Sequence, residues 1–299
     1  MNCKVSIIIP TLSNVEGIKY LVNYFKNKKE YQLIIVHNKS QNSNLKAQNQ
    51  ILKLKTNNLI YLPQRENLGY AKANNLGVKY AKAEWLLLLN DDIEFKYQIS
   101  NIKYQNDKSK LKNKNKNQIE ELINLAKKNN FDAVAPILIN PDGGVENYGY
   151  RVLPIGKMEL IKSDTNLRMN ANDAYNANLQ IDGLTVACLL IKKEVYEKLG
   201  GFDESFFAYL EDVDFFLRFK KEGFKFAITP DIAVFHHHRK TSSKMGWFKE
   251  KQDLVNWWRL YFKHPDIIRF SPSFLIERAR NVMGLVKKII KLTLINLKN

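Results

Sequence analysis

The sequence predicts an α/β fold built on a mostly parallel sheet with helices packed against it. Short runs of β-branched and aliphatic residues alternate with segments whose apolar residues recur at helical spacing. Strands and helices in such rapid alternation are typical of a parallel sheet wound with helices. With 299 residues, 45% of them hydrophobic, the chain suffices for one large domain with an appendage or for two modest domains.

The first half of the chain carries the clearest alternation. Apolar runs predict four strands, at residues 5–10, 33–36, 59–62 and 86–89. Helical spacing of apolar residues predicts helices between them, at residues 18–25, 44–54 and 71–81. Residues from about 96 to 118 are instead rich in Lys and Asn, which predicts a mobile insertion or lid.

The second half is less regular. The same criteria predict a helix at residues 119–128, strands at 132–139, 224–228 and 232–235, and a buried apolar run at 183–191. Residues 211–219 combine carboxylates with phenylalanines, which predicts a helix whose first turn carries acids, where the helix dipole favours them. From about residue 243 the chain is basic and aromatic, and a last helix begins near Ser273. Its apolar residues form a stripe, at Leu275, Ala279, Val282, Val286, Ile289 and Leu297.

The formal charge of +17 is typical of proteins that meet nucleic acid, an anionic membrane surface or anionic substrates. We expect no nucleic-acid partner, because acidic residues cluster where strands end and would repel a phosphate backbone. Cys3 and Cys188 lack a metal-ligand spacing and are expected to be reduced thiols of a cytoplasmic protein. The sequence shows no signal peptide and no apolar run of about 18 residues, so we expect any contact with a membrane to be at the membrane surface.

Three clusters of acidic or metal-competent residues follow predicted strands or begin a predicted helix. They are Asp91-Asp92, Glu211-Asp212 and the histidines at 236–238. Two adjacent carboxylates repel each other unless a cation lies between them or one is protonated, and Mg²⁺ or Mn²⁺ fits such oxygen ligands. Each cluster also has a simpler interpretation. The aspartates would form a surface turn, the second pair would be acids at a helix N-terminus, and the histidines would lie in a solvated loop. A parallel sheet favours the functional interpretation, because it brings strand ends to one edge.

Six motifs occur in the order seen in one known enzyme family. They are Val5 to Thr11, Asn67-x-Gly69-Tyr70…Asn75-x-Gly77, Leu89-Asn90-Asp91-Asp92, Gly200-Gly201-Phe202-Asp203-Glu204, Glu211-Asp212-Val213-Asp214 and the region of His236. By these motifs, residues 4–242 resemble the family 2 glycosyltransferases, and most closely the rhamnosyltransferase-like branch that builds bacterial surface polysaccharides.

The resemblance implies a GT-A fold, in which a nucleotide-binding α/β half precedes an acceptor-binding half. It divides the chain into a catalytic domain at residues 1–242 and a C-terminal helical appendage, the tail, at residues 243–299. It also implies inverting transfer of a sugar from a nucleotide-diphosphate donor to a hydroxyl of a glycan or lipid-linked acceptor.

The resemblance also assigns metal-binding roles. Asp92 matches the last Asp of the family's metal-binding motif, which bridges Mg²⁺ or Mn²⁺ to the diphosphate, and Asp91 has a supporting role. His236 matches a further metal or diphosphate ligand, with His238 as the alternative. A cation there suits the chemistry, because the leaving group gains negative charge as the bond to the sugar breaks.

Asp212 matches the family's general base, and Glu211 lies beside it. The residues assigned to the nucleotide-sugar are Pro10, Thr11, His37, Asn67, Gly69, Asn75, Asp91 and Gly183. His37 stands where the family usually has a nucleoside-binding Asp, and residues 11–14 read Thr-Leu-Ser-Asn in place of Thr-Tyr-Asn. These departures leave open which nucleotide the donor carries, and an inert, packed His37 is the alternative.

The basic aromatic tail has two interpretations. Either it binds an anionic membrane surface, which suits an enzyme acting on a lipid-linked acceptor at the inner face of the plasma membrane, or it packs against the catalytic domain or a second subunit in a homodimer. The alternatives to an active enzyme are a catalytically degenerate relative and a basic nucleic-acid-binding protein. A dinucleotide-dependent enzyme and a sugar nucleotidylyltransferase are disfavoured, because no glycine-rich loop follows the strand at residues 5–10.

Overall fold

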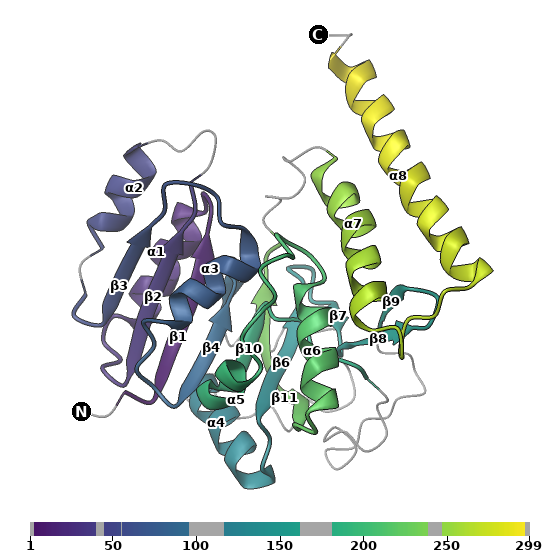
Figure 1. The fold of residues 1–299 in the computed structure, drawn as a ribbon. Coiled ribbons are helices and arrows are strands. Elements are labelled where there is room, and N and C mark those ends of the chain that lie inside the picture. The colour runs from purple at the N-terminus through teal and green to yellow at the C-terminus, as the bar shows by residue number, and fades with distance from the viewer. Residues whose placement is uncertain are drawn as a thin grey trace.

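The computed structural model describes residues 3–39, 45–54, 56–95, 117–161, 181–238 and 247–296. A large sheet runs through its centre with helices on both faces (Figure 1). The Lys- and Asn-rich insertion predicted at about 96–118 lies outside the described residues, apart from its last two positions.

Nine strands form the central sheet of the described chain, which is mixed: four of its strand pairings are parallel and four are antiparallel. They are β1 (Val5–Thr11), β2 (Tyr31–His37), β3 (Leu59–Pro63), β4 (Trp85–Leu89), β5 (Ile93–Glu94), β6 (Ala133–Ile139), β7 (Val145–Asn147), β10 (Cys188–Lys192) and β11 (Phe226–His236). Their order is β3-β2-β1-β4-β10-β6-β11-β5, with β7 paired to β6. A separate hairpin consists of β8 (Tyr150–Leu153) and β9 (Lys157–Leu160).

The predicted parallel sheet is confirmed for β3-β2-β1-β4 and for β6 beside β11. Strand β10, from the apolar run at 183–191, runs antiparallel to both of its neighbours. The strands predicted at 224–228 and 232–235 form one long strand, β11, whose pairing with β6 shifts register between Thr229 and Ala233. Pro230 lies in that shift, where its missing N–H costs no regular ladder bond.

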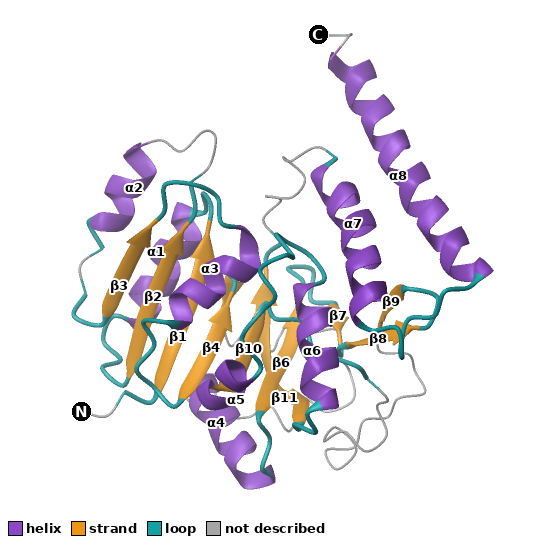
Figure 2. Cartoon of the chain, in the orientation of Figure 1, coloured by secondary structure: helices purple, strands orange, loops and turns teal. Residues whose placement is uncertain are grey.

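The described residues form eight helices (Figure 2). They are α1 (Val15–Phe25), α2 (Leu45–Leu52), α3 (Gly69–Val78), α4 (Gln118–Asn129), α5 (Lys193–Lys198), α6 (Glu211–Lys221), α7 (Phe248–Lys263) and α8 (Pro272–Asn296). Helices α7 and α8 lie to one side of the sheet (Figure 2). Helix α1 begins where the Asn14 side chain accepts a hydrogen bond from the Gly17 N–H at 3.0 Å. None of the helices in the described ranges combines the length and apolarity needed to span a bilayer.

The two faces of the sheet carry separate hydrophobic clusters, because successive strand residues point to opposite faces. Ile7 and Ile9 of β1 pack on the face covered by α1 and α4, whereas Ile8 packs on the face covered by α3, α5 and α6. A third cluster joins α6 to the β8–β9 hairpin, α7 and the start of α8, where Phe274 is fully buried. Beyond that start, α8 extends away from the sheet (Figure 1).

Candidate active site

A cavity of about 870 Å³ opens at the carboxyl ends of β1 and β4. All three clusters singled out in the sequence contribute to its lining, through Asp91 and Asp92, Glu211 and Asp212, and His236. Four further residues predicted to bind the nucleotide-sugar also line it: Pro10, Thr11, Asn67 and Gly69. The tertiary structure therefore collects side chains from positions 10 to 236 around one space, at the edge where α/β sheets bind ligands.

The β1–α1 loop holds Asp91 in place. The Thr11 hydroxyl donates a hydrogen bond to the Asp91 carboxylate at 2.6 Å. The Asn14 amide donates to the Asp91 backbone carbonyl at 2.7 Å and to its carboxylate at 3.2 Å. Asp91 and Asp92 thus occupy a turn, as the simpler interpretation holds, but the turn is half-buried and faces the cavity.

Asp92 lies beside His236, at the end of β11. His236 Nε2 lies 3.3 Å from Asp92 Oδ1, and its Nδ1 hydrogen-bonds with Glu146 Oε2 at 2.8 Å. Burial by itself lowers the pKa of His236, but the hydrogen bonds with Asp92 and Glu146 outweigh burial and raise the pKa to about 9. The backbone N–H of His237 also donates to the Asp92 carbonyl at 3.0 Å, which fixes the two segments together.

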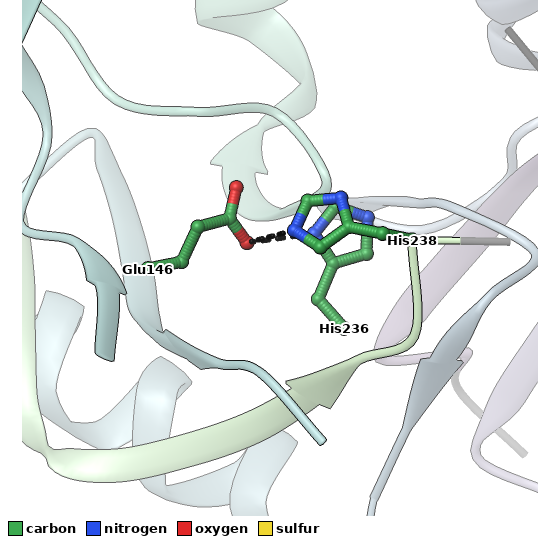
Figure 3. Close-up of side chains that lie close together, drawn as sticks. All are labelled: Glu146, His236 and His238. Atoms are coloured by element: carbon green, nitrogen blue, oxygen red, sulfur yellow. Dashed lines mark hydrogen bonds and ion pairs between the residues drawn. The ribbon is translucent and has the colours of Figure 1, made fainter. Parts of the chain in front are cut away.

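Glu146 joins this cluster from β7, a position with no signal in the sequence. Figure 3 shows Glu146, His236 and His238 converging, and His238 Nε2 lies 3.1 Å from Glu146 Oε2. One potential ligand atom from each of the three lies within 4.8 Å of the others. Carboxylate oxygens and imidazole nitrogens are both ligands of divalent cations, and Asp92 adds a second carboxylate. The residues present therefore fit a divalent cation.

Glu211 and Asp212 begin α6 on the cavity wall. Two consecutive residues before them, Tyr209 and Leu210, adopt left-handed backbone conformations with φ of 67° and 65°. Such strain is rare for residues with a side chain and is typical of functional sites. Glu211 is 6% exposed, and its Oε2 finds no hydrogen-bond partner among the described residues.

This burial controls the charge of the pair. Burial, followed by repulsion from Asp212, raises the pKa of Glu211, and burial likewise raises the pKa of Asp212. A carboxylate with a raised pKa is a better proton acceptor than an ordinary one near neutral pH. The Glu211–Asp212 pair therefore places a candidate proton acceptor on the wall of the cavity.

Three of the residues predicted to bind the nucleotide-sugar do not line this cavity. His37 is 1% exposed and hydrogen-bonds through Nδ1 with the Tyr61 hydroxyl at 2.6 Å, and burial lowers its pKa. Asn75 accepts from the Phe202 N–H at 3.0 Å and donates to the Phe202 carbonyl at 2.8 Å. Gly183 packs so closely on Tyr150 that an added Cβ would lie 2.2 Å from the Tyr150 hydroxyl.

Helix α7, from the predicted tail, supplies a wall of the cavity. Its residues that line the cavity are Phe248, Lys249, Asp253 and Trp257. The ring of Phe248 lies against those of Phe207 and Tyr209 from the loop before α6. Burial raises the pKa of Asp253 to about 6, against the opposing effect of Lys249. The aromatic residues of this helix gave no indication in sequence that they reach the cavity.

The chain matches two protein-family models. Residues 6–99 match glycosyl transferase family 2, and residues 167–241 match the N-terminal domain of galactosyltransferase. The first match contains Thr11 and the Asp91-Asp92 pair, and the second contains Glu211, Asp212 and His236.

Curated relatives are about a quarter identical to the chain over the aligned residues. The low-salt glycan biosynthesis hexosyltransferase Agl10 of Haloferax volcanii is 25% identical over 236 residues, covering 78% of this chain and 66% of the relative. An N-acetylglucosaminyl-diphospho-decaprenol L-rhamnosyltransferase of Mycobacterium tuberculosis is 25% identical over 207 residues, covering 62% of this chain and 61% of the relative. The chain thus spans less than two thirds of the length of these relatives.

Two solved structures have a fold similar to that of the chain. A mannosyltransferase from Pyrobaculum calidifontis, in complex with GDP-Man and Mn²⁺, has a TM-score of 0.56 at 13% identity, over 95% of this chain and 70% of that one. GalNAc-T7 with UDP, GalNAc and Mn²⁺ has a TM-score of 0.56 at 12% identity, over 80% of this chain and 44% of that one. Residues 6–99 thus match the glycosyl transferase family 2 model across β1 to β4, and the likeness to these two structures shows that the chain has a GT-A fold.

Proposed function

We propose that the protein transfers a sugar from a nucleotide-diphosphate donor to a hydroxyl of a glycan or lipid-linked acceptor, with inversion at the anomeric carbon. One observation carries this proposal: Asp92 and Asp212, from segments 120 positions apart, line the same cavity. A metal-competent carboxylate and a candidate base facing one space are the two parts that a direct displacement of a diphosphate requires.

Asp92 and His236 would hold the Mg²⁺ or Mn²⁺ ion, with Glu146 and His238 beside them. When bound, the cation supplies positive charge that stabilises the departing diphosphate. The hydrogen bonds from Thr11 and Asn14 fix the carboxylate and the carbonyl of Asp91, and the next residue of the same turn, Asp92, lines the cavity. Asp91 is thereby a positioning residue in this proposal.

The Glu211–Asp212 pair would accept the proton of the attacking hydroxyl. The acceptor oxygen forms a bond to the anomeric carbon as the bond between that carbon and the diphosphate oxygen breaks. The hydroxyl proton passes to the carboxylate, and the electron pair leaves with the diphosphate. Because attack and departure occur on opposite faces of the sugar, the anomeric configuration inverts.

The names of the relatives support a place in glycan assembly. The hexosyltransferase of Haloferax volcanii and the rhamnosyltransferase of Mycobacterium tuberculosis motivate a hexose or rhamnose donor and a surface-polysaccharide product. A lipid-linked acceptor would be presented at the inner face of the plasma membrane, so we propose that the protein works there as a cytoplasmic, peripheral enzyme.

A thermal-shift screen of nucleotide-sugars with Mn²⁺ and with Mg²⁺ tests the proposal, because a ligand that binds the native state raises the melting temperature. The donor found in this way is then used in transfer assays. We expect Asp212→Asn to abolish transfer while the donor still raises the melting temperature. Transfer by Asp212→Asn at the wild-type rate would remove Asp212 as the base. A donor that binds without any transfer by the wild-type protein would favour the catalytically degenerate relative.

A further inference from the structure

Helix α8 carries a wide apolar surface that the rest of the described chain leaves uncovered. Nine of its apolar residues are exposed or lie on the exposed face: Leu275, Ile276, Ala279, Val282, Met283, Val286, Ile289, Ile290 and Leu294. Ile276, Met283 and Ile290 each retain 53% of their accessible surface. At 100° per residue these positions span an arc of about 140° along one side of the helix. We call this arc the apolar face of α8.

The opposite side of α8 is the one that contacts the protein. Phe274 is buried against Trp258 and Tyr261 of α7, and Arg278 donates to the Gly156 carbonyl at 2.5 Å. Further along, Lys288 lies 3.7 Å from Glu250 of α7. The helix is therefore held in a defined rotation, which turns its less apolar side toward α7 and its apolar face away. The stripe predicted from the sequence does not pack on the described part of the catalytic domain.

Basic residues border the apolar face along one edge. Arg280, Lys287 and Lys291 are exposed and lie next to the arc, and α8 contains five basic residues and one acidic residue, Glu277. Glu277 is already paired with Arg280. An apolar arc flanked by cations matches a bilayer interface, where acyl chains cover the arc and anionic headgroups meet the cations.

A second copy of α8 fits this surface less well. A two-stranded helical pair covers a narrow seam of two positions per heptad and usually has charged residues beside it. Here Ala279, Val282, Val286 and Ile289 would form such a seam, but Ile276, Met283 and Ile290 beside it are apolar and would stay exposed. A lipid surface covers the whole arc and neutralises the basic edge, whereas a second copy adds only more positive charge.

We propose that α8 is an interfacial helix that inserts its apolar face into an anionic lipid surface and thereby attaches the protein to the membrane. The inference concerns the surface of α8 alone and does not depend on the transfer reaction. Because α7 joins α8 to the cavity through Phe248 and Trp257, attachment would also set how the cavity faces the lipid.

Co-sedimentation of the full chain with vesicles tests this proposal. We expect binding to vesicles of phosphatidylcholine with 30% phosphatidylglycerol, chosen as about the anionic fraction at which basic helices bind well, and at least about tenfold weaker binding to phosphatidylcholine alone. Ile290→Glu should weaken binding about tenfold or more. Leu52→Glu is the matched control, because Leu52 is 54% exposed and belongs to α2, a helix at the other side of the molecule from α8 (Figure 1). Lys287→Glu with Lys291→Glu should remove the preference for anionic vesicles.

Circular dichroism melts establish that each variant is folded, and light scattering measures its mass in solution. Equal vesicle binding by the wild type, Ile290→Glu and Leu52→Glu would overturn the proposal, as would a wild-type protein that binds neither vesicle. A stable dimer in lipid-free solution that Ile290→Glu converts to a monomer would show that a second copy covers the face. Transfer to a water-soluble acceptor should be unchanged in Ile290→Glu, so that failure of the membrane proposal leaves the transferase proposal standing.

Discussion

His264, the C-cap residue of α7, hydrogen-bonds through its Nε2 with Oδ1 of Asp214 in α6, at a distance of 2.9 Å. Asp214 is completely buried and also accepts from Lys263 at 2.6 Å and from Arg218 at 2.9 Å. It lies two positions beyond Asp212, on the same helix. The end of α7 therefore holds the first turn of α6, which carries the candidate base.

Asp214→Asn should destabilise the protein by about 3–5 kcal/mol, because it removes the buried carboxylate that pairs with Arg218 and Lys263 and hydrogen-bonds with His264. Burial acts to raise the pKa of Asp214, but the hydrogen bond with His264 and the charges of Arg218 and Lys263 outweigh it and lower the pKa to about 2. A lowered carboxylate pKa stabilises the native state above its unfolded pKa of about 4 and loses that effect as the pH falls toward 2.

Urea unfolding at several pH values measures this effect. The wild type and Asp214→Asn should differ most near pH 7 and converge as the pH falls below about 4. Glu197→Gln serves as the control, since Glu197 forms an exposed pair with Lys193 at 3.6 Å and should change stability by less than about 0.5 kcal/mol. Parallel curves for the wild type and Asp214→Asn at all pH values would contradict the role of the Asp214 charge.

Transfer activity should rise with pH across a range above that of an ordinary carboxylate. The Glu211–Asp212 pair must lose a proton to act as a base, and its pKa values are raised by burial and mutual repulsion. The acidic limb of kcat/KM is therefore expected well above about pH 4, the range of an exposed carboxylate. A profile that is already flat at pH 5 would show that these groups do not limit the reaction.

The same pair should make the protein less stable as the pH rises. A carboxyl whose pKa is raised on folding favours the native state at pH values below its unfolded pKa, and this advantage is lost as the pH rises through the folded pKa. Glu211→Gln should therefore raise the melting temperature more at pH 8.5 than at pH 5, values chosen as about either side of the raised pKa range. Melting scans at the two pH values measure this increase. An equal rise in melting temperature at both pH values would be inconsistent with a raised pKa of Glu211.

Glu146→Gln should weaken Mn²⁺ binding by about 10- to 100-fold, because it removes either a ligand or the group that orients His236. Glu94→Gln is a close control: both carboxylates are similarly buried and both hydrogen-bond with a histidine, Glu94 with His237 at 2.7 Å. Glu94 does not line the cavity. Isothermal titration with Mn²⁺ alone gives the affinities, and an equal loss in both variants would argue against a specific role for Glu146.

Gly17→Ala should lower both stability and activity, although alanine favours helix formation by about 0.5–1 kcal/mol over glycine. A Cβ at Gly17 would lie 1.8 Å from the Asp91 carbonyl oxygen, so the turn that carries Asp91 and Asp92 must move. Gly284→Ala in α8 is the control. It should raise the melting temperature, since no atom lies within 4 Å of the added Cβ. Melting temperature and kcat/KM are measured for both variants. Wild-type kinetics in Gly17→Ala would mean that the turn at Asp91 and Asp92 tolerates the added methyl group.

The apolar strands and the order of the motifs were visible in the sequence because both are local patterns. An unbroken run such as 86–89 is buried on both faces wherever the strand lies, so its burial is predicted without knowing its neighbours. The same run carries no information on direction. This is why the run at 183–191 indicated burial, while the antiparallel pairing of β10 with β4 and β6 emerged only in the sheet.

The candidate site divides in the same way. The sequence by itself determined the fold class, and it singled out Asp92 and Asp212 as candidate site residues, since each lies in a recognisable motif at the end or start of an element. Only the tertiary structure decided that Glu146 joins His236, that His37 turns to Tyr61, and that α8 directs its apolar face to solvent. These three features depend on contacts between segments that are distant in the sequence, and such contacts produce no periodic pattern in the sequence from which they could be predicted.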